Sequence, residues 1–184
     1  MPIHAGSISD GQGGALLVSP VSVIVSGNYA YVVGDGSNAL EIVDVTDPST
    51  PMHVGSIADG EGGAMLCGAY SVYVAGNYAY IASYCSNALE IVDITDPTTP
   101  VHHASITDGE GGALLAGANS VYIDGNYAYV TSWGSNALEI VDITNPATPL
   151  HAGSITDGAG GALLSCPSSV YISGNYAYVT SSCS

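Results

Sequence analysis

The stretch SNALEIVDITDPTTPVHHASITDGEGG, residues 86–112, contains the pattern that decides the fold. The run ALEIVDIT (88–95) is rich in β-branched and apolar residues, and it ends at DPTTP, where two prolines stop strand pairing. The run HHASITDG (102–109) then leads into a glycine-rich turn. No apolar period of 3.6 residues is present. The stretch therefore predicts short strands separated by turns, and no helix.

A hairpin signal precedes this stretch. SVYVAG (71–76) and YAYIAS (78–83) flank the dipeptide Gly76-Asn77, which is typical of a two-residue β-turn. Together with the two runs that follow, these segments make four short strands in one unit. Four strands in a unit of this length are typical of one blade of a β-propeller.

The unit recurs along the chain. The sequence GNYAY begins at four positions separated by 49 residues, namely Gly27, Gly76, Gly125 and Gly174. A period in the forties indicates a propeller or a solenoid. We therefore expect an all-β fold, a small β-propeller of about four blades built from 49-residue repeats, with the last blade incomplete. The 184 residues form a single repeat domain: a partial unit (1–26), repeats that start near 27, 76 and 125, and a hairpin (166–184) in the last blade.

The strand count leaves a gap in the last blade. The chain opens with a segment that matches a fourth strand, His4–Ile8, and stops after the second strand of the last unit. Three explanations are open: the ring closes imperfectly, a partner chain fills the gap, or the sequence is a piece of a longer array. An unfilled gap leaves open strand edges, which are templates for association.

The motif LEIVD recurs at 40–44, 89–93 and 138–142, each time followed by DP or NP and then TP. With the upstream VYVAGNYAYIAS, this motif resembles the LVIVD-repeat β-propellers of bacterial and archaeal surface proteins. The resemblance extends over nearly the whole chain and implies the propeller fold. It implies no catalytic motif. Members of that family ordinarily carry basic residues, whereas this chain has no lysine or arginine.

The charge of the chain excludes several partners. There is no lysine or arginine, against 16 acidic residues, so the formal net charge is −16; an average chain of this length carries roughly twenty basic residues. Without a basic patch, nucleic acids and anionic membrane surfaces are poor partners. No apolar run is long enough to span a membrane, and the N-terminal MPIHAGSISDG lacks the features of a signal peptide. We expect an extracellular or cell-surface protein whose export signal is not present in this chain.

Four cysteines lie near the ends of two hairpins. The turn at Gly174 pairs residues whose numbers sum to 349, as Cys166 and Cys183 do. The turn at Gly76 requires a sum of 153, and Cys67 with Cys85 gives 152. Cross-strand cysteines can approach bonding distance. Two disulfides are therefore predicted, with paired free thiols as the alternative, and disulfides imply an oxidising compartment.

Histidines and acidic turns are candidate cation ligands. One histidine recurs per unit and His103 is extra. They lie on the outermost strand, so a surface or interface role is favoured over a metal site within one ring or a metal bridge between subunits. The DGEGG turns place an Asp and a Glu two residues apart and could offer oxygens to calcium, although a turn that needs the backbone freedom of glycine is the favoured explanation. The candidate ligands are His53, Asp59, Glu61, His102, His103, Asp108 and Glu110. No cofactor is required.

Two sets of acidic residues occupy defined places in the third strand. Asp44, Asp93 and Asp142 end this strand, each two residues before a threonine, and we expect them to form Asx-turns. Glu41, Glu90 and Glu139 lie between apolar neighbours, where a buried carboxylate needs a raised pKa or a bound ion. The repeated tyrosines of YAY are expected to pack between blades, with carbohydrate stacking as the alternative.

These observations favour a structural role. No unit breaks the repeat with a catalytic constellation, so we expect no enzymatic activity, and a metal-dependent enzyme is the weakest alternative. The preferred hypothesis is a self-assembling extracellular protein that forms a filament or sheath head to tail. The hairpin Val170–Thr180 would accept the N-terminal segment of another copy, with His4, Ile8, Val170 and Tyr178 as the assembly residues. The alternative is a monomeric cell-surface module that binds a glycan or a protein.

Overall fold

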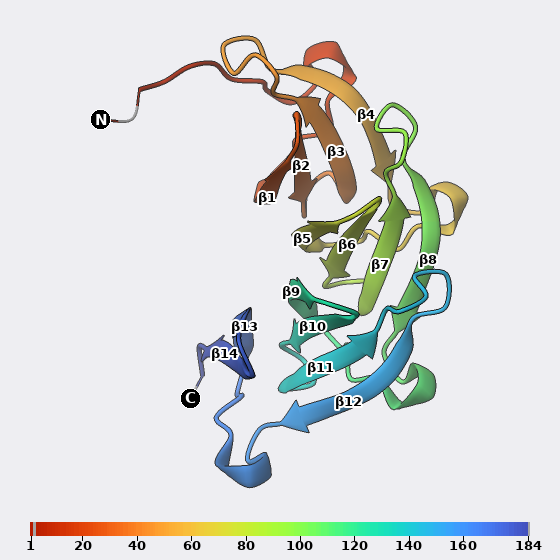
Figure 1. The fold of residues 1–184 in the computed structure, drawn as a ribbon, viewed down its shortest axis with the longest axis vertical. Helices are drawn as coiled ribbons and strands as arrows, with labels where there is room; N and C mark the ends of the chain where they lie inside the picture. The colour runs from red at the N-terminus through yellow and green to blue at the C-terminus, as the bar shows by residue number, and fades with distance from the viewer. Residues whose placement is uncertain (2, 184) are drawn as a thin grey trace.

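Four antiparallel sheets follow one another along the chain in this computed structural model, which describes residue 1 and residues 3–183 (Figure 1). We call them blades 1 to 4. Blade 1 contains β1 (Pro20–Ser26), β2 (Tyr29–Gly34), β3 (Ala39–Asp44) and β4 (Met52–Ala58). Blade 2 contains β5 (Ala69–Ala75), β6 (Tyr78–Ser83), β7 (Ala88–Asp93) and β8 (Val101–Thr107). Blade 3 contains β9 (Ala118–Asp124), β10 (Tyr127–Ser132), β11 (Ala137–Asp142) and β12 (Leu150–Thr156), and blade 4 contains β13 (Pro167–Ser173) and β14 (Tyr176–Ser181).

Short 3-10 turns precede each blade: η1 (Gln12–Gly14), η2 (Glu61–Gly63), η3 (Glu110–Gly112) and η4 (Ala159–Gly161). Within a blade, the first two strands are joined by a two-residue turn. Gly76 opens this turn in blade 2 with φ +59, the left-handed region that a type II′ turn assigns to glycine. The Gly-Asn dipeptide therefore fixes the register of every hairpin.

The blades form an arc (Figure 1). The first strand of each blade lies toward the inside of the arc, and β4, β8 and β12 run along its outside. Blade 1 and the two-stranded blade 4 lie at the two ends. The prediction of an all-β propeller with an incomplete last blade is confirmed.

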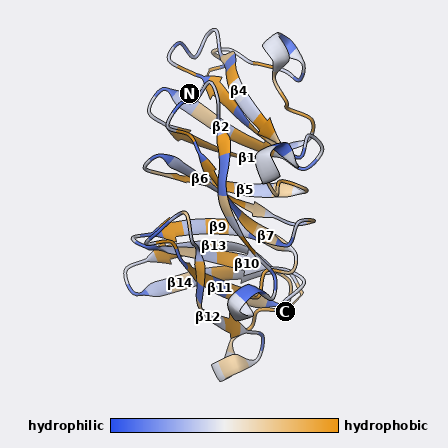
Figure 2. Ribbon diagram, turned by 90° about the vertical axis from the view of Figure 1, so that its right-hand side faces the viewer, coloured by the Kyte–Doolittle hydropathy of each residue, from blue (hydrophilic) through white to orange (hydrophobic). Residues whose placement is uncertain are grey.

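The hydrophobic core lies between blades rather than within them. One cluster joins blades 1 and 2 around Leu40, Leu66 and Ile81, and a second joins blades 2 and 3 around Leu89 and Leu115. A smaller cluster joins blades 3 and 4. Burial of each Leu or Ile contributes about 1.5–3 kcal/mol, so each blade is stabilised by its neighbours. Figure 2 shows the hydrophobic colour concentrated on the strands.

The N-terminal segment differs from its prediction. The structure assigns no strand to residues 3–9, so the fourth strand expected at His4–Ile8 is not formed. In blades 1 to 3 the fourth strand pairs with the third, and the described residues place no third strand beside this segment. None of the helices among the described residues is long and apolar enough to cross a membrane.

Candidate functional site

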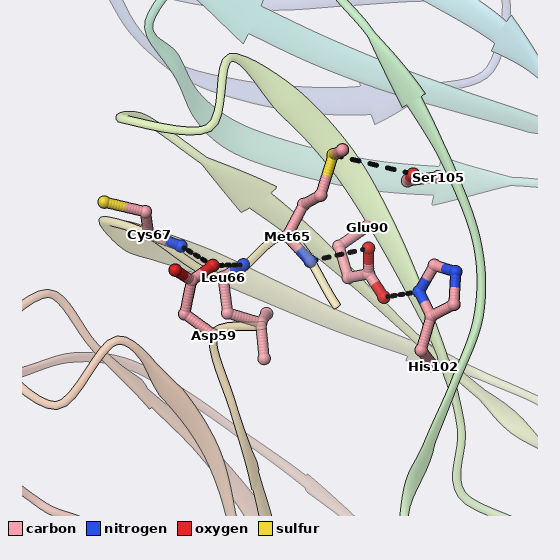
Figure 3. A network of polar contacts seen from close by, with 7 residues as sticks. All are labelled: Asp59, Met65, Leu66, Cys67, Glu90, His102 and Ser105. Carbon is pink, nitrogen blue, oxygen red and sulfur yellow. Dashed lines mark hydrogen bonds and ion pairs between the residues drawn. The ribbon is translucent and has the colours of Figure 1, made fainter. Parts of the chain in front are cut away.

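A buried carboxylate is paired with a histidine in each complete blade. In blade 2, Oε1 of Glu90 lies 2.6 Å from Nδ1 of His102 (Figure 3), and Glu90 has no exposed surface. The corresponding pairs are Glu41–His53 at 2.6 Å and Glu139–His151 at 2.5 Å. Because the chain has no lysine or arginine, histidine is the only side chain that can supply a positive charge to these carboxylates.

A β-bulge places the histidine on the correct face of the sheet. In blade 2, Glu90 pairs with Ser105 and Ile91 with Ala104, but Val92 then pairs with His102, which leaves one extra residue in β8. The bulge therefore turns His102 to the face that carries Glu90. The same register shift occurs in the outer strands of blades 1 and 3.

The second carboxylate oxygen holds the segment that enters the blade. Oε2 of Glu90 accepts the backbone N–H of Met65 at 3.1 Å, and Oε2 of Glu41 and Glu139 accept the N–H groups of Leu16 and Leu114 at 3.0 Å. One glutamate thus links the third strand, the outer strand and the entering segment. Burial raises the pKa of Glu90, while the hydrogen bond from His102 opposes this rise; Glu139 behaves in the same way with His151.

The aspartates of the glycine-rich turns are bound to backbone groups. Oδ1 of Asp59 accepts the N–H groups of Leu66 and Cys67 at 2.8 and 2.9 Å (Figure 3). Asp108 accepts the N–H groups of the equivalent residues in the next unit. These side chains therefore fix the conformation of the turns.

The other candidate cation ligands also have protein partners. Glu61 and Glu110 accept the N–H groups of the residues three positions earlier. His53 and His102 are paired with buried glutamates, and His103 packs against Tyr78 with ring centroids 4.8 Å apart. Among the described residues, no three His, Cys, Asp or Glu side chains lie close enough together to hold a metal ion. The structure therefore does not bring the predicted ligands together.

The aspartates that end the third strand form the predicted Asx-turns. Oδ1 of Asp44, Asp93 and Asp142 accepts a backbone N–H two residues ahead at 2.8 Å, from Thr46, Thr95 and Thr144 respectively. These hydrogen bonds lower the pKa of each aspartate. Their role is to shape the turn that leaves the strand.

A contact between blades was missed by the sequence analysis. Asn38 has φ +50, and its Oδ1 accepts the N–H of Gly68 in the next blade at 2.7 Å. Asn87 and Asn136 make the same contact with Gly117 and Cys166. The repeated SNALE motif is the sequence signal, because asparagine tolerates the left-handed region better than most residues.

The two cysteine pairs differ. Cys166 and Cys183 form a disulfide with Cα atoms 5.4 Å apart, whereas Cys67 and Cys85 are free thiols, so the second predicted disulfide is not formed in the structure. Cys166 has φ +52 and occupies the position of Gly68, while Cys67 stands one residue earlier. Because of this offset of one residue, the numbers of Cys67 and Cys85 sum to 152 and not to the 153 that the turn at Gly76 requires.

The predicted assembly residues lie at both ends of the arc. His4 is exposed, and Ile8 is half-buried beside a cavity of about 410 Å³ that β1 also lines. Tyr178 is exposed on blade 4. Val170 is buried against blade 3, so its side chain holds β13 in place and is not available to a partner.

The family model described as LVIVD repeat matches residues 20–59, 68–108, 117–157 and 167–182. No curated protein matches the chain. These four ranges coincide with the four blades.

Several solved structures share the fold. Kuenenia stuttgartiensis hydrazine synthase is 18% identical, covering 90% of this chain and 42% of its own, with a TM-score of 0.61. The periplasmic gluconolactonase of Pseudomonas aeruginosa is 14% identical over 76% of this chain and 40% of its own, with a TM-score of 0.62. The β-propeller domain of Cps50 (Swd1) from Myceliophteria thermophila is 10% identical over 82% of this chain and 46% of its own, with a TM-score of 0.57. The chain therefore spans less than half the length of these proteins, and the likeness shows the fold alone.

Proposed function

Because the chain belongs to the LVIVD-repeat family, whose unit recurs along it four times, we propose that it is a non-enzymatic structural protein that associates with further copies of itself, end to end, in a filament or sheath. The observation that carries this proposal is the exposure, at the two ends of the arc, of apolar positions that are buried wherever two blades meet.

The first end is the open face of blade 1. Val23 is 63% exposed, whereas its equivalent in blade 2, Val72, is 5% exposed because blade 1 covers it. Val25 is exposed on the same face. A blade of another copy placed here would cover these valines as blade 1 covers Val72, which favours association through apolar contact.

The second end is the open face of blade 4. Tyr178 is 58% exposed, while its equivalent in blade 2, Tyr80, is 3% exposed. Ile155, at the same end, is likewise exposed although the equivalent Ile106 is buried. The two ends are complementary, because each presents one half of the interface that joins consecutive blades inside the molecule. An interface of this kind, between different surfaces of two copies, extends into a filament when the rotation between copies does not close a ring.

The edge of β14 adds backbone hydrogen-bonding groups at this end. In blades 1 to 3 the second strand pairs on both sides, but among the described residues β14 pairs with β13 alone. The unpaired edge can accept an added strand. The extended N-terminal segment of another copy, which includes the exposed His4, is the donor that we propose.

The charge of the chain sets a condition on assembly. Copies with a formal net charge of −16 repel one another, and no basic patch offsets the repulsion. Association must then rest on apolar contact and backbone pairing, and ions that screen the acidic residues should promote it. Calcium could act in this way between carboxylates, but the proposal requires no cofactor.

An extracellular or cell-surface location accords with this role, because disulfides such as Cys166–Cys183 persist in oxidising compartments. Catalysis is not part of the proposal. Each buried glutamate that could orient a histidine also holds a backbone N–H, so the Glu–His pairs act as structural ties.

The test is to place charges on the open face of blade 1. The double variant Val23→Asp, Val25→Asp should keep the fold, since both side chains are exposed, and should remain a single particle in sedimentation velocity under conditions in which the natural chain forms larger species. Val101→Asp is the matched control, because Val101 is an exposed valine on the outer strand of blade 2. Assembly of the double variant to the same size would overturn the proposal.

The second candidate is a monomeric module that binds a ligand on one face of the arc. It is favoured by exposed aromatic residues outside the two ends, such as Tyr70 and Trp133. Particles that stay separate at every concentration, yet bind a ligand, would support this candidate.

A further inference from the structure

Three aromatic rings form a row across blades 2 and 3. The ring centroids of Tyr70 and Tyr84 are 5.6 Å apart, and those of Tyr84 and Trp133 are 6.2 Å apart, with the planes tilted by 44° and 43°. Tyr70 is 40% exposed and Trp133 is 44% exposed, while Tyr84 is half-buried. The row is therefore a continuous aromatic surface that solvent can reach.

The row stands where the repeat is broken. Tyr84 and Trp133 occupy one position of the 49-residue unit, which is Asp35 in blade 1 and Ser182 in blade 4. The residues that follow are the same in three blades, because Asn-Ala-Leu-Glu recurs at 38–41, 87–90 and 136–139. A turn that folds equally with Asp or Tyr does not require an aromatic ring, so the rings are not explained by the fold.

The surroundings hold the row in place. A Cβ built on Gly117, which has φ +66, would lie 3.1 Å from Cε2 of Tyr84, so the tyrosine ring packs on a glycine backbone. At the Tyr70 end of the row, the carboxylate of Asp35 is near enough to act on the Tyr70 hydroxyl. The pKa of Tyr70 is raised, first by burial and then by the negative charge of Asp35.

From these contacts we infer that the row of Tyr70, Tyr84 and Trp133, with Asp35 at its end, binds a ligand that carries a quaternary ammonium or guanidinium cation. Aromatic faces attract a cation placed within about 6 Å of the ring centroid. The carboxylate of Asp35 adds a negative charge, and the chain has no lysine or arginine that would compete for the rings.

The charge of the protein favours this class of ligand over others. A formal net charge of −16 concentrates cations at the surface and repels phosphorylated or carboxylated ligands. A neutral saccharide could also stack on the rings, but it would gain nothing from Asp35 or from the negative field. Dependence on ligand charge and on salt therefore separates the two classes.

Trp133 makes the test specific, because it is the only tryptophan of the chain. Choline chloride should change its fluorescence with saturation in the millimolar range, beyond the effect of sodium chloride at equal ionic strength. The neutral analogue 3,3-dimethylbutan-1-ol has nearly the same shape and should bind at least about threefold more weakly. Equal responses to choline and the alcohol, or saturation by maltotetraose that salt does not change, would overturn the inference.

Variants that leave the reporter intact locate the site. Tyr84→Ser introduces the residue that blade 4 carries at the equivalent position, Ser182. Tyr70→Ser likewise introduces the blade 4 equivalent of Tyr70, which is Ser168. Each should weaken choline binding roughly two- to fivefold, and Asp35→Asn should weaken it and lower its salt dependence. Tyr127→Ser is the control, because Tyr127 is similarly exposed but is not among the stacked rings.

The outcome does not depend on end-to-end assembly. The variant Val23→Asp, Val25→Asp should bind choline as the natural chain does, since neither valine is in the row. Unchanged binding in both tyrosine variants would contradict the inference even if the chain forms filaments.

Discussion

Oε1 of Glu90 and Nδ1 of His102 lie 2.6 Å apart, with the carboxylate fully buried and the imidazole at the outer strand of blade 2. This contact recurs in every complete blade. It supplies a partner for the buried carboxylates of a chain that has no lysine or arginine. The buried acids are paired with histidines, while most of the others accept backbone N–H groups in turns. Histidine thus replaces the usual basic residues only where burial requires it.

Replacement of Glu90 should destabilise blade 2. In Glu90→Gln one carboxylate oxygen becomes an NH2 donor, so either the N–H of Met65 or Nδ1 of His102 loses its partner, and a buried polar group left without its partner costs about 1–3 kcal/mol. We expect the free energy of unfolding in urea to fall by roughly this amount. Asp124→Asn, at an exposed position, should change it by less than about 0.5 kcal/mol. Equal stability of the two variants would show that the buried pair contributes nothing.

The contribution of Glu90 to the free energy of unfolding should fall as pH rises, because its carboxylate pKa is raised in the folded chain. Burial raises the pKa of Glu90 above its ordinary value of 4.5, so the folded chain holds this proton more tightly than the unfolded chain. The contribution of Glu90 is then fully present below 4.5 and declines as pH rises through the folded pKa. Unfolding measured from pH 4 upward should show the difference between the natural chain and Glu90→Gln shrinking as pH rises. A difference that grows with pH would contradict the sign of this shift.

Asn38 contributes to stability in two ways, through its hydrogen bond to the next blade and through its tolerance of the left-handed backbone conformation. Asn38→Gly removes the hydrogen bond to Gly68 but tolerates φ +50, and it should cost about 1 kcal/mol. Asn38→Ala also keeps a Cβ in the left-handed region without the polar side chain that lets asparagine adopt it, and it should cost about 1–2 kcal/mol more than the glycine variant. Chemical denaturation of both variants provides the comparison. If the two substitutions cost the same, backbone conformation plays no part.

Cysteine position should control bonding in blade 2. A Cβ built on Gly68 would lie 3.0 Å from Sγ of Cys85, and Gly68 holds the place that Cys166 holds in blade 4. In Gly68→Cys the introduced thiol should therefore bond to Cys85 and leave Cys67 alkylatable, whereas the natural chain should show two alkylatable thiols. Intact mass after alkylation, followed by mapping of linked peptides, distinguishes these outcomes. A linkage of Cys67 to Cys85 in the natural chain would show that the one-residue offset does not prevent bonding.

Much of the fold follows from the repeat. The 49-residue interval, the Gly-Asn turns and the prolines after ALEIVD each impose a local geometry, so the blades and the Asx-turns of Asp93 and its equivalents could be predicted. The Glu–His pair could not, because it depends on a bulge in β8 that brings His102 to the face of Glu90. The row of aromatic rings also escaped prediction, since Tyr70 and Trp133 are distant in sequence and meet only through Tyr84.

Removal of residues 1–9 tests the strand-addition part of the assembly. The described residues of this segment, 1 and 3–9, form no strand in their own molecule, so the truncated chain should keep its β-rich circular dichroism spectrum. It should lose the polymer, or require a higher concentration to form it, because the edge of β14 has no donor. Polymers that form equally well without the segment would mean that the apolar end faces alone drive association.

Electron microscopy of the negatively stained chain, across a range of concentrations and salt, tests end-to-end association most directly. The complementary ends of the arc predict filaments in which one copy follows another, and more of them as salt screens the 16 acidic residues. Separate particles of single-chain size at every concentration and ionic strength would contradict the proposed function.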